Sequence, residues 1–272
     1  MKEAFDVHAD ASPLGAQQAF SRYARDVFST CYPETPHKLR HALAAHPLVA
    51  FDAIAELGES LPAGSVDCNL GDAPIGAESE RGVGRPPIGE AIRGLEHSSG
   101  WAVLRNIGQH PAYSELLAAV IDELRPDIER RTGRMSVIEA CLFITNLETV
   151  TPHHSDPRHL LLMQIAGSKK LTQFAPGETG EDDRADGATV WNIRPGDAVF
   201  VPVMAPHRIK GAAGPAISLS FTWRSKWSQA EADARAFNAL LRSRGLKPAS
   251  TNRWPAGNAG KALLWKLFRP FV

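Results

Sequence analysis

The chain has 272 residues, enough to bury a sizeable core. Its composition of 43% hydrophobic and 22% charged residues is that of a folded protein and argues against long disorder. Thirty basic and thirty acidic side chains cancel, so no global field would draw the protein to nucleic acid or to an acidic membrane, and we expect neither as a partner.

The first half of the chain predicts helices mixed with short strands. Ser12, at the head of the segment 12–29, predicts a capped helix, because serine caps helices and the proline after it suits the first turn. An apolar stripe at helical spacing predicts a second helix over residues 113–131, bent at Pro126. Loops rich in Gly and Pro, the longest at residues 71–89, separate apolar runs that predict strands. These runs cover residues 48–51, 66–69 and 101–106.

The second half is a succession of short β-type runs, which is typical of a barrel or sandwich. The runs cover residues 137–145, 160–165, 171–174, 188–193, 198–203 and 216–223. Residues 228–243 predict a helix, and residues 261–272 form a basic, aromatic tail. We expect one compact, mainly β domain. It divides into supporting helices and strands (1–135), a β core (136–225) and a C-terminal helical extension (226–272).

A histidine and a carboxylate lie two residues apart within the β-rich half. On a strand alternate side chains share a face, so His154 and Asp156 would converge. A third ligand is expected from His207, which follows a glycine–aspartate turn and the apolar run 198–203. Two histidines and one carboxylate make a facial triad, which leaves positions open for O2 and a chelating organic acid and so favours non-haem Fe(II).

Two other histidines lie close to this pair in the sequence. His153 competes with His154 as a ligand if Pro152 disturbs the alternation of the strand. His159 is expected to be a hydrogen-bond donor behind the ligands or an ordinary surface residue.

At residues 150–223 the chain resembles the JmjC-type and cupin-like Fe(II)/2-oxoglutarate-dependent oxygenases. The motifs that carry the resemblance are Thr151-Pro152 before the H-x-D pair, the segment 164–169, and Pro195-Gly196-Asp197 through Pro202 to His207. The resemblance implies a double-stranded β-helix of the cupin or jelly-roll kind. The chain departs from the family at Leu160, where an asparagine is common.

The resemblance also implies how a cosubstrate would bind. Thr151 and Lys169 stand where the family binds the distal carboxylate of 2-oxoglutarate, and Ser220 takes the place of an asparagine on the last strand. An ammonium and a hydroxyl suit this task, because together they neutralise and orient a carboxylate. Lys170, next in the chain, and Arg224, beyond the distal histidine, are alternatives to Lys169.

The implied activity is that of a dioxygenase, which decarboxylates 2-oxoglutarate to succinate and CO2 while it hydroxylates a protein side chain or a small metabolite. The alternative is a non-catalytic metal-binding cupin that senses a ligand or assists assembly. The loop at residues 71–89 and an acidic stretch at residues 178–186 would form the rim that selects the substrate.

The sequence also indicates where the protein is located and how it assembles. The N-terminus lacks a basic start followed by an apolar run, and no apolar stretch reaches the roughly 20 residues that span a bilayer. Cys31, Cys68 and Cys141 are widely spaced without a C-x-x-C pair, which favours a reducing cytoplasm. Members of the resembled family often pair through C-terminal helices, so we expect a homodimer through residues 228–243 and the tail.

Overall fold

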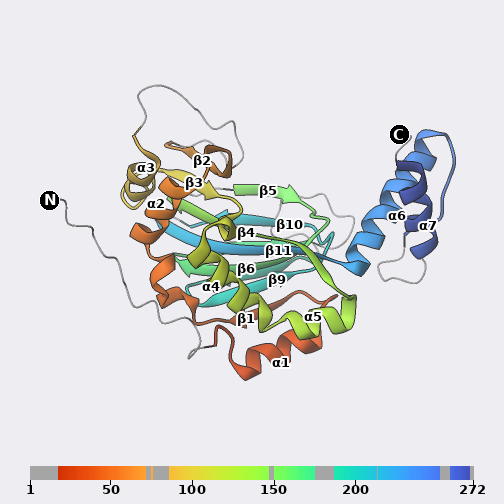
Figure 1. The fold of residues 1–272 in the computed structure, drawn as a ribbon, viewed down its shortest axis with the longest axis horizontal. Helices are drawn as coiled ribbons and strands as arrows, with labels where there is room; N and C mark the ends of the chain where they lie inside the picture. Colours follow the sequence, from red (N-terminus) through yellow and green to blue (C-terminus); the bar gives the residue numbers. More distant parts are fainter. Residues whose placement is uncertain are drawn as a thin grey trace.

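The computed structural model describes residues 18–71, 75, 86–146, 150–174, 187–212, 214–251 and 258–269. Two antiparallel β-sheets form its centre (Figure 1). In spatial order, the seven-stranded sheet contains β1 (His37–Arg40), β9 (Asp197–Val201), β6 (His159–Ala166), β11 (Pro215–Ser225), β4 (Met135–Asn146), β3 (Gly100–Leu104) and β2 (Val66–Asn69). The four-stranded sheet contains β5 (Val150–His154), β10 (His207–Gly211), β7 (Lys169–Gln173) and β8 (Thr189–Ile193).

Helices cover the outer face of the larger sheet, and two more project from its end (Figure 1). The covering helices are α1 (Arg22–Cys31), α2 (Phe51–Ser60), α3 (Ile88–Gly94), α4 (Pro111–Asp122) and α5 (Arg125–Thr132). Short 3-10 turns lie at η2 (Leu43–Ala45), η3 (Pro47–Val49), η4 (Ala63–Ser65) and η5 (Ile107–Gln109). After β11 the chain enters α6 (Lys226–Ser243), against which α7 (Ala259–Phe268) packs.

The central strands of the larger sheet are buried on both faces. Along β6, Leu161 and Met163 pack with the covering helices, whereas Leu160 and Leu162 point between the two sheets. A strand that is buried on both sides is apolar at nearly every position, which is why residues 160–163 of β6 form a continuous apolar run. The structure is therefore the double-stranded β-helix with flanking helices that the sequence predicted.

Most predicted strands are present within one or two residues of their expected bounds, but the prediction for residues 48–51 is wrong. That run forms η3 and the start of α2, because a short apolar run has no periodicity that separates a strand from a helix. The predicted helix over residues 113–131 is two helices, α4 and α5. The first helix is capped by Ser21. Ser12 lies outside the described residues.

Two short strands, β1 and β10, were not predicted. Each has charged residues on one face, so its sequence reads as polar: β10 carries Arg208 and Lys210 on either side of Ile209. The division of the chain at residues 135 and 225 stays a prediction. Across the part of the chain that the structure describes, no helix is long and apolar enough to cross a membrane.

Candidate metal centre

His154 and His207 come from neighbouring strands of the smaller sheet. His154 is the last residue of β5, His207 is the first residue of β10, and the two are register partners. Asp156 lies beyond the end of β5, where its carbonyl oxygen accepts a hydrogen bond from the Met204 backbone N–H at 2.7 Å. The loop before β10 therefore holds Asp156, which corrects our expectation that Asp156 belongs to the same strand as His154.

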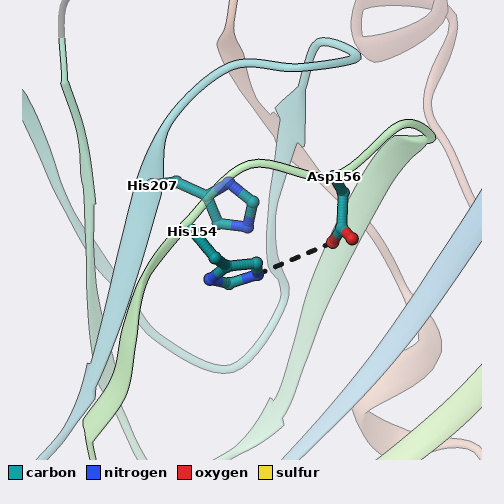
Figure 2. Close-up of side chains that lie close together, drawn as sticks. All are labelled: His154, Asp156 and His207. Atoms are coloured by element: carbon teal, nitrogen blue, oxygen red, sulfur yellow. Dashed lines mark ion pairs between the residues drawn. The ribbon is translucent and has the colours of Figure 1, made fainter. Parts of the chain in front are cut away.

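The three side chains point toward one another (Figure 2). Nε2 of His154 lies 3.6 Å from Oδ2 of Asp156, and the rings of His154 and His207 have centroids 4.2 Å apart. One ligand atom from each of the three residues lies within 4.8 Å of the others. Two imidazole nitrogens and one carboxylate oxygen thus converge on one point.

The hydrogen bonds of the two imidazole rings prepare them for a metal. Nδ1 of His154 lies 2.8 Å from the Pro152 carbonyl oxygen, and Nδ1 of His207 lies 2.9 Å from the Ala205 carbonyl oxygen. A carbonyl only accepts, so each Nδ1 carries the proton and each Nε2 of a neutral ring offers a lone pair. Nε2 of His207 is buried without a hydrogen-bond partner. This donor set fits a metal ion, since ligating histidines commonly bond a carbonyl through the other ring nitrogen.

The charges at the centre suit a cation at neutral pH. The close approach of Asp156 raises the pKa of His154, and the same contact lowers the pKa of Asp156. Burial, with the neighbouring His154, lowers the pKa of His207 to about 4, so this ring is neutral. Metal ligands must be deprotonated, and the carboxylate and the His207 ring already are.

A cavity of about 120 Å³ opens beside these three side chains. Its polar lining, apart from them, consists of Thr151, Lys169, Ser220 and Thr222. All the residues that the sequence assigned to the metal and the cosubstrate therefore lie around one cavity. Thr222 was missed, although its position two residues after Ser220 on the same strand is a signal that alternation offers.

Comparison with known proteins supports one fold family. No family model matches the chain. It is 24% identical to Jumonji C domain-containing protein 5 of Drosophila melanogaster over 158 residues, which cover 48% of this chain and 39% of that protein. The structure of YcfD, a ribosomal oxygenase from Escherichia coli, superposes with a TM-score of 0.51 at 15% identity, over 92% of this chain and 66% of that one. YcfD in complex with cobalt and 2-oxoglutarate gives a TM-score of 0.50 at 15% identity, over 92% of this chain and 67% of that one.

The chain has the JmjC-type oxygenase fold. The resemblance read from residues 150–223 is thereby confirmed, and so is the jelly-roll architecture. The chain spans 39% of the length of the Drosophila protein and about two thirds of YcfD.

Three basic side chains were candidates for binding the cosubstrate: Lys169, Lys170 and Arg224. Of these three, Lys169 lines the cavity. Lys169 is 6% exposed, and burial lowers the pKa of its ammonium to about 8. No carboxylate among the described residues pairs with it. Lys170 follows on β7 and points to the other face of the sheet, and Arg224 donates from Nη1 to Oε1 of Gln229 at 3.0 Å. Neither Lys170 nor Arg224 lines the cavity.

Three further residues near the ligands were considered from the sequence. Leu160, where the family commonly has an asparagine, lines the cavity with an apolar side chain. His159 is fully buried on the opposite face of β6 and stacks on Trp223 with ring centroids 5.5 Å apart. Our expectation of a donor behind the ligands or a surface residue is therefore wrong for His159. His153 packs against Phe174, with ring centroids 4.9 Å apart, and does not belong to the three converging side chains.

The two segments expected at the rim of the cavity are described only in part. Of the loop at residues 71–89, Ile75 lines the cavity. The acidic stretch at residues 178–186 lies outside the described residues.

Proposed function

We propose that the chain is an Fe(II)- and 2-oxoglutarate-dependent oxygenase. His154, Asp156 and His207 would hold Fe(II), and a set of three protein ligands leaves coordination positions for a cosubstrate and O2. The observation that carries the proposal is the convergence, in one cavity, of this ligand set with a buried lysine that has no carboxylate partner among the residues that the structure describes. YcfD, which has the same fold, has been solved with cobalt and 2-oxoglutarate, and this supports the proposal.

In this proposal Thr151, Lys169 and Ser220 bind the cosubstrate. The Lys169 ammonium balances the distal carboxylate of 2-oxoglutarate, and the two hydroxyls add hydrogen bonds. Leu160 and Leu162 exclude water from the cavity walls, which strengthens each of these interactions. Bound Fe(II) would supply the activation of O2, and the protein would orient the cosubstrate and the substrate.

We propose that the substrate is a protein side chain in preference to a small metabolite, because YcfD is described as a ribosomal oxygenase. We also propose a homodimer through the C-terminal helices. Leu263, Leu264 and Leu267 of α7 are exposed beside a groove between α6, α7 and residues 134–136, and a second copy would cover them. None of the three cysteines, all of which the structure describes, is in a disulfide, which supports a cytoplasmic location.

The test of the proposed activity is formation of succinate from 2-oxoglutarate by the Fe(II)-loaded protein. His154→Ala and Asp156→Ala should each lower succinate formation and Co(II) affinity by more than about 100-fold, because each removes a ligand. His153→Ala is the matched control, since its side chain packs outside the centre, and it should retain both properties.

Tight Co(II) binding without succinate formation by the wild-type protein would contradict the oxygenase proposal. That result would favour the alternative, a metal-binding cupin that acts as a sensor or assembly factor. Equal loss in His153→Ala would contradict the assignment of the ligands.

A further inference from the structure

An ion pair stands at the edge of the cavity, next to the metal-binding residues. Nη1 of Arg158 contacts Oε2 of Glu139 and donates to Oγ1 of Thr222 at 3.4 Å. Thr222 lines the cavity, and Glu139 on β4 is its register partner. Arg158 follows Asp156 by two residues. The pair is therefore part of the wall that ends at the metal centre.

This wall lies at the end of the cavity away from Lys169. Along β10, His207 pairs with Gln173 and Gly211 pairs with Lys169, so four residues separate the two levels, roughly 13 Å at the usual rise of a strand. The metal-binding residues lie at one level, and the proposed cosubstrate lysine lies at the other. A substrate that must reach the metal would thus meet Glu139 and Arg158, not Lys169.

The pair has unused hydrogen-bonding capacity that solvent can reach. The side chains of Arg158 and Glu139 are 27% and 42% exposed. A guanidinium has five N–H donors, and within the described part of the chain only Nη1 has a protein partner. Oε1 of Glu139 likewise has no partner among those residues. As far as the described residues go, the Nε and Nη2 donors of Arg158 and the Oε1 acceptor of Glu139 are thus available to a ligand.

The net charge of the pair is zero, which indicates the chemistry of the group that it would bind. A free carboxylate or ammonium gains little from a neutral pair, because the attraction of one member is offset by the repulsion of the other. A carbonyl oxygen and an N–H that point to the same side satisfy both members at once. In an extended polypeptide the N–H and the C=O of one residue have this arrangement.

The polar wall continues over the neighbouring strands, which favours an extended ligand. Arg105, which follows β3, binds Asp67 on β2 at 2.7 Å. In the antiparallel register of β3 with β4, Arg105 lies level with Cys141, which is two residues from Glu139 on β4. A small metabolite would contact one pair, whereas a peptide segment reaches both.

We propose that Glu139 and Arg158 are specificity-determining residues that bind the backbone N–H and C=O of one residue in an extended polypeptide substrate. Nε and Nη2 of Arg158 donate to its carbonyl oxygen, and Oε1 of Glu139 accepts from its N–H. A side chain of the bound segment then lies over His154, Asp156 and His207. That last step rests on the proposed oxygenase function; the binding of the peptide backbone does not.

The test is binding of a random library of N-acetylated, C-terminally amidated heptapeptides to the Co(II)-loaded protein, measured by mass spectrometry of the retained peptides. Arg158→Lys keeps a positive charge beside Glu139 but removes the Nε and Nη2 donors. Glu139→Gln removes the charged acceptor. Each should lower retention about tenfold or more, since each loses hydrogen bonds to a charged group. Arg125→Lys is the matched control, because Arg125 pairs with Asp122 on the helical side at 2.6 Å.

Three results would overturn the proposal: no retention by the wild-type protein, equal retention by Arg158→Lys, or loss of Co(II) together with peptide in that variant. Co(II) content is therefore measured from absorbance for every sample. Succinate formation without peptide, in the wild-type protein alone, is measured in parallel. Its absence would contradict the oxygenase function, whereas peptide retention decides the role of Glu139 and Arg158.

Discussion

Replacing Lys169 with methionine should stabilise the protein in the absence of ligands. Burial lowers the pKa of this ammonium from 10.5 to about 8, and no described carboxylate offsets the burial. That difference, at about 1.4 kcal/mol per pKa unit, corresponds to an unfavourable contribution of up to about 3 kcal/mol. Methionine has a similar length and no charge, so Lys169→Met should raise the free energy of unfolding at pH 7 by up to this amount.

The effect should have a defined pH dependence. Below pH 8 both the folded and the unfolded chain carry the proton on Lys169, and the full destabilisation is present. Between pH 8 and pH 10.5 the folded chain releases the proton first, so the stability of the wild type rises toward that of Lys169→Met. Above pH 10.5 the contribution vanishes.

Urea unfolding at pH 7 and pH 9.5 measures both quantities. Lys170→Met is the control, because this side chain lies on the other face of the sheet, and it should not reproduce the pH-dependent gap. In addition, 2-oxoglutarate with Co(II) should raise the Tm of the wild type and not that of Lys169→Met. The reasoning is refuted if Lys169→Met is no more stable than the wild type at pH 7, or if the gap does not narrow at pH 9.5.

Two further outcomes are expected. Burial lowers the pKa of His41 to about 4, so the unfolded chain takes up the proton first as the pH falls below 6.5. Between pH 7 and pH 5, His41→Asn should therefore lose about 2 kcal/mol less free energy of unfolding than the wild type. Equal losses of the two proteins in urea unfolding would contradict this. Leu263→Glu with Leu267→Glu, at positions 62% and 60% exposed, should convert a homodimer to a monomer in light scattering, whereas Leu246→Glu should not. A monomeric wild-type protein would exclude the dimer.

The sequence by itself predicted the β-rich core and brought together the three residues of the candidate metal centre. β6 and β9 are apolar at nearly every position because both of their faces are buried, and such runs can be recognised without coordinates. His154, Asp156 and His207 could be selected because few residue types bind iron and their spacing in a β context is restrictive. These are properties of local composition.

Tertiary structure decided how these residues meet. Asp156 reaches the histidines through a loop contact with Met204. His207 is the first residue of β10, a strand that was not predicted because its outer face is charged. Lys169 could not be separated from Lys170 by sequence, since only the register of β7 turns one of them into the cavity. Glu139 and Arg158 are 19 residues apart in the chain and carry no motif. Strand register and burial depend on contacts between distant segments, which a local pattern does not contain.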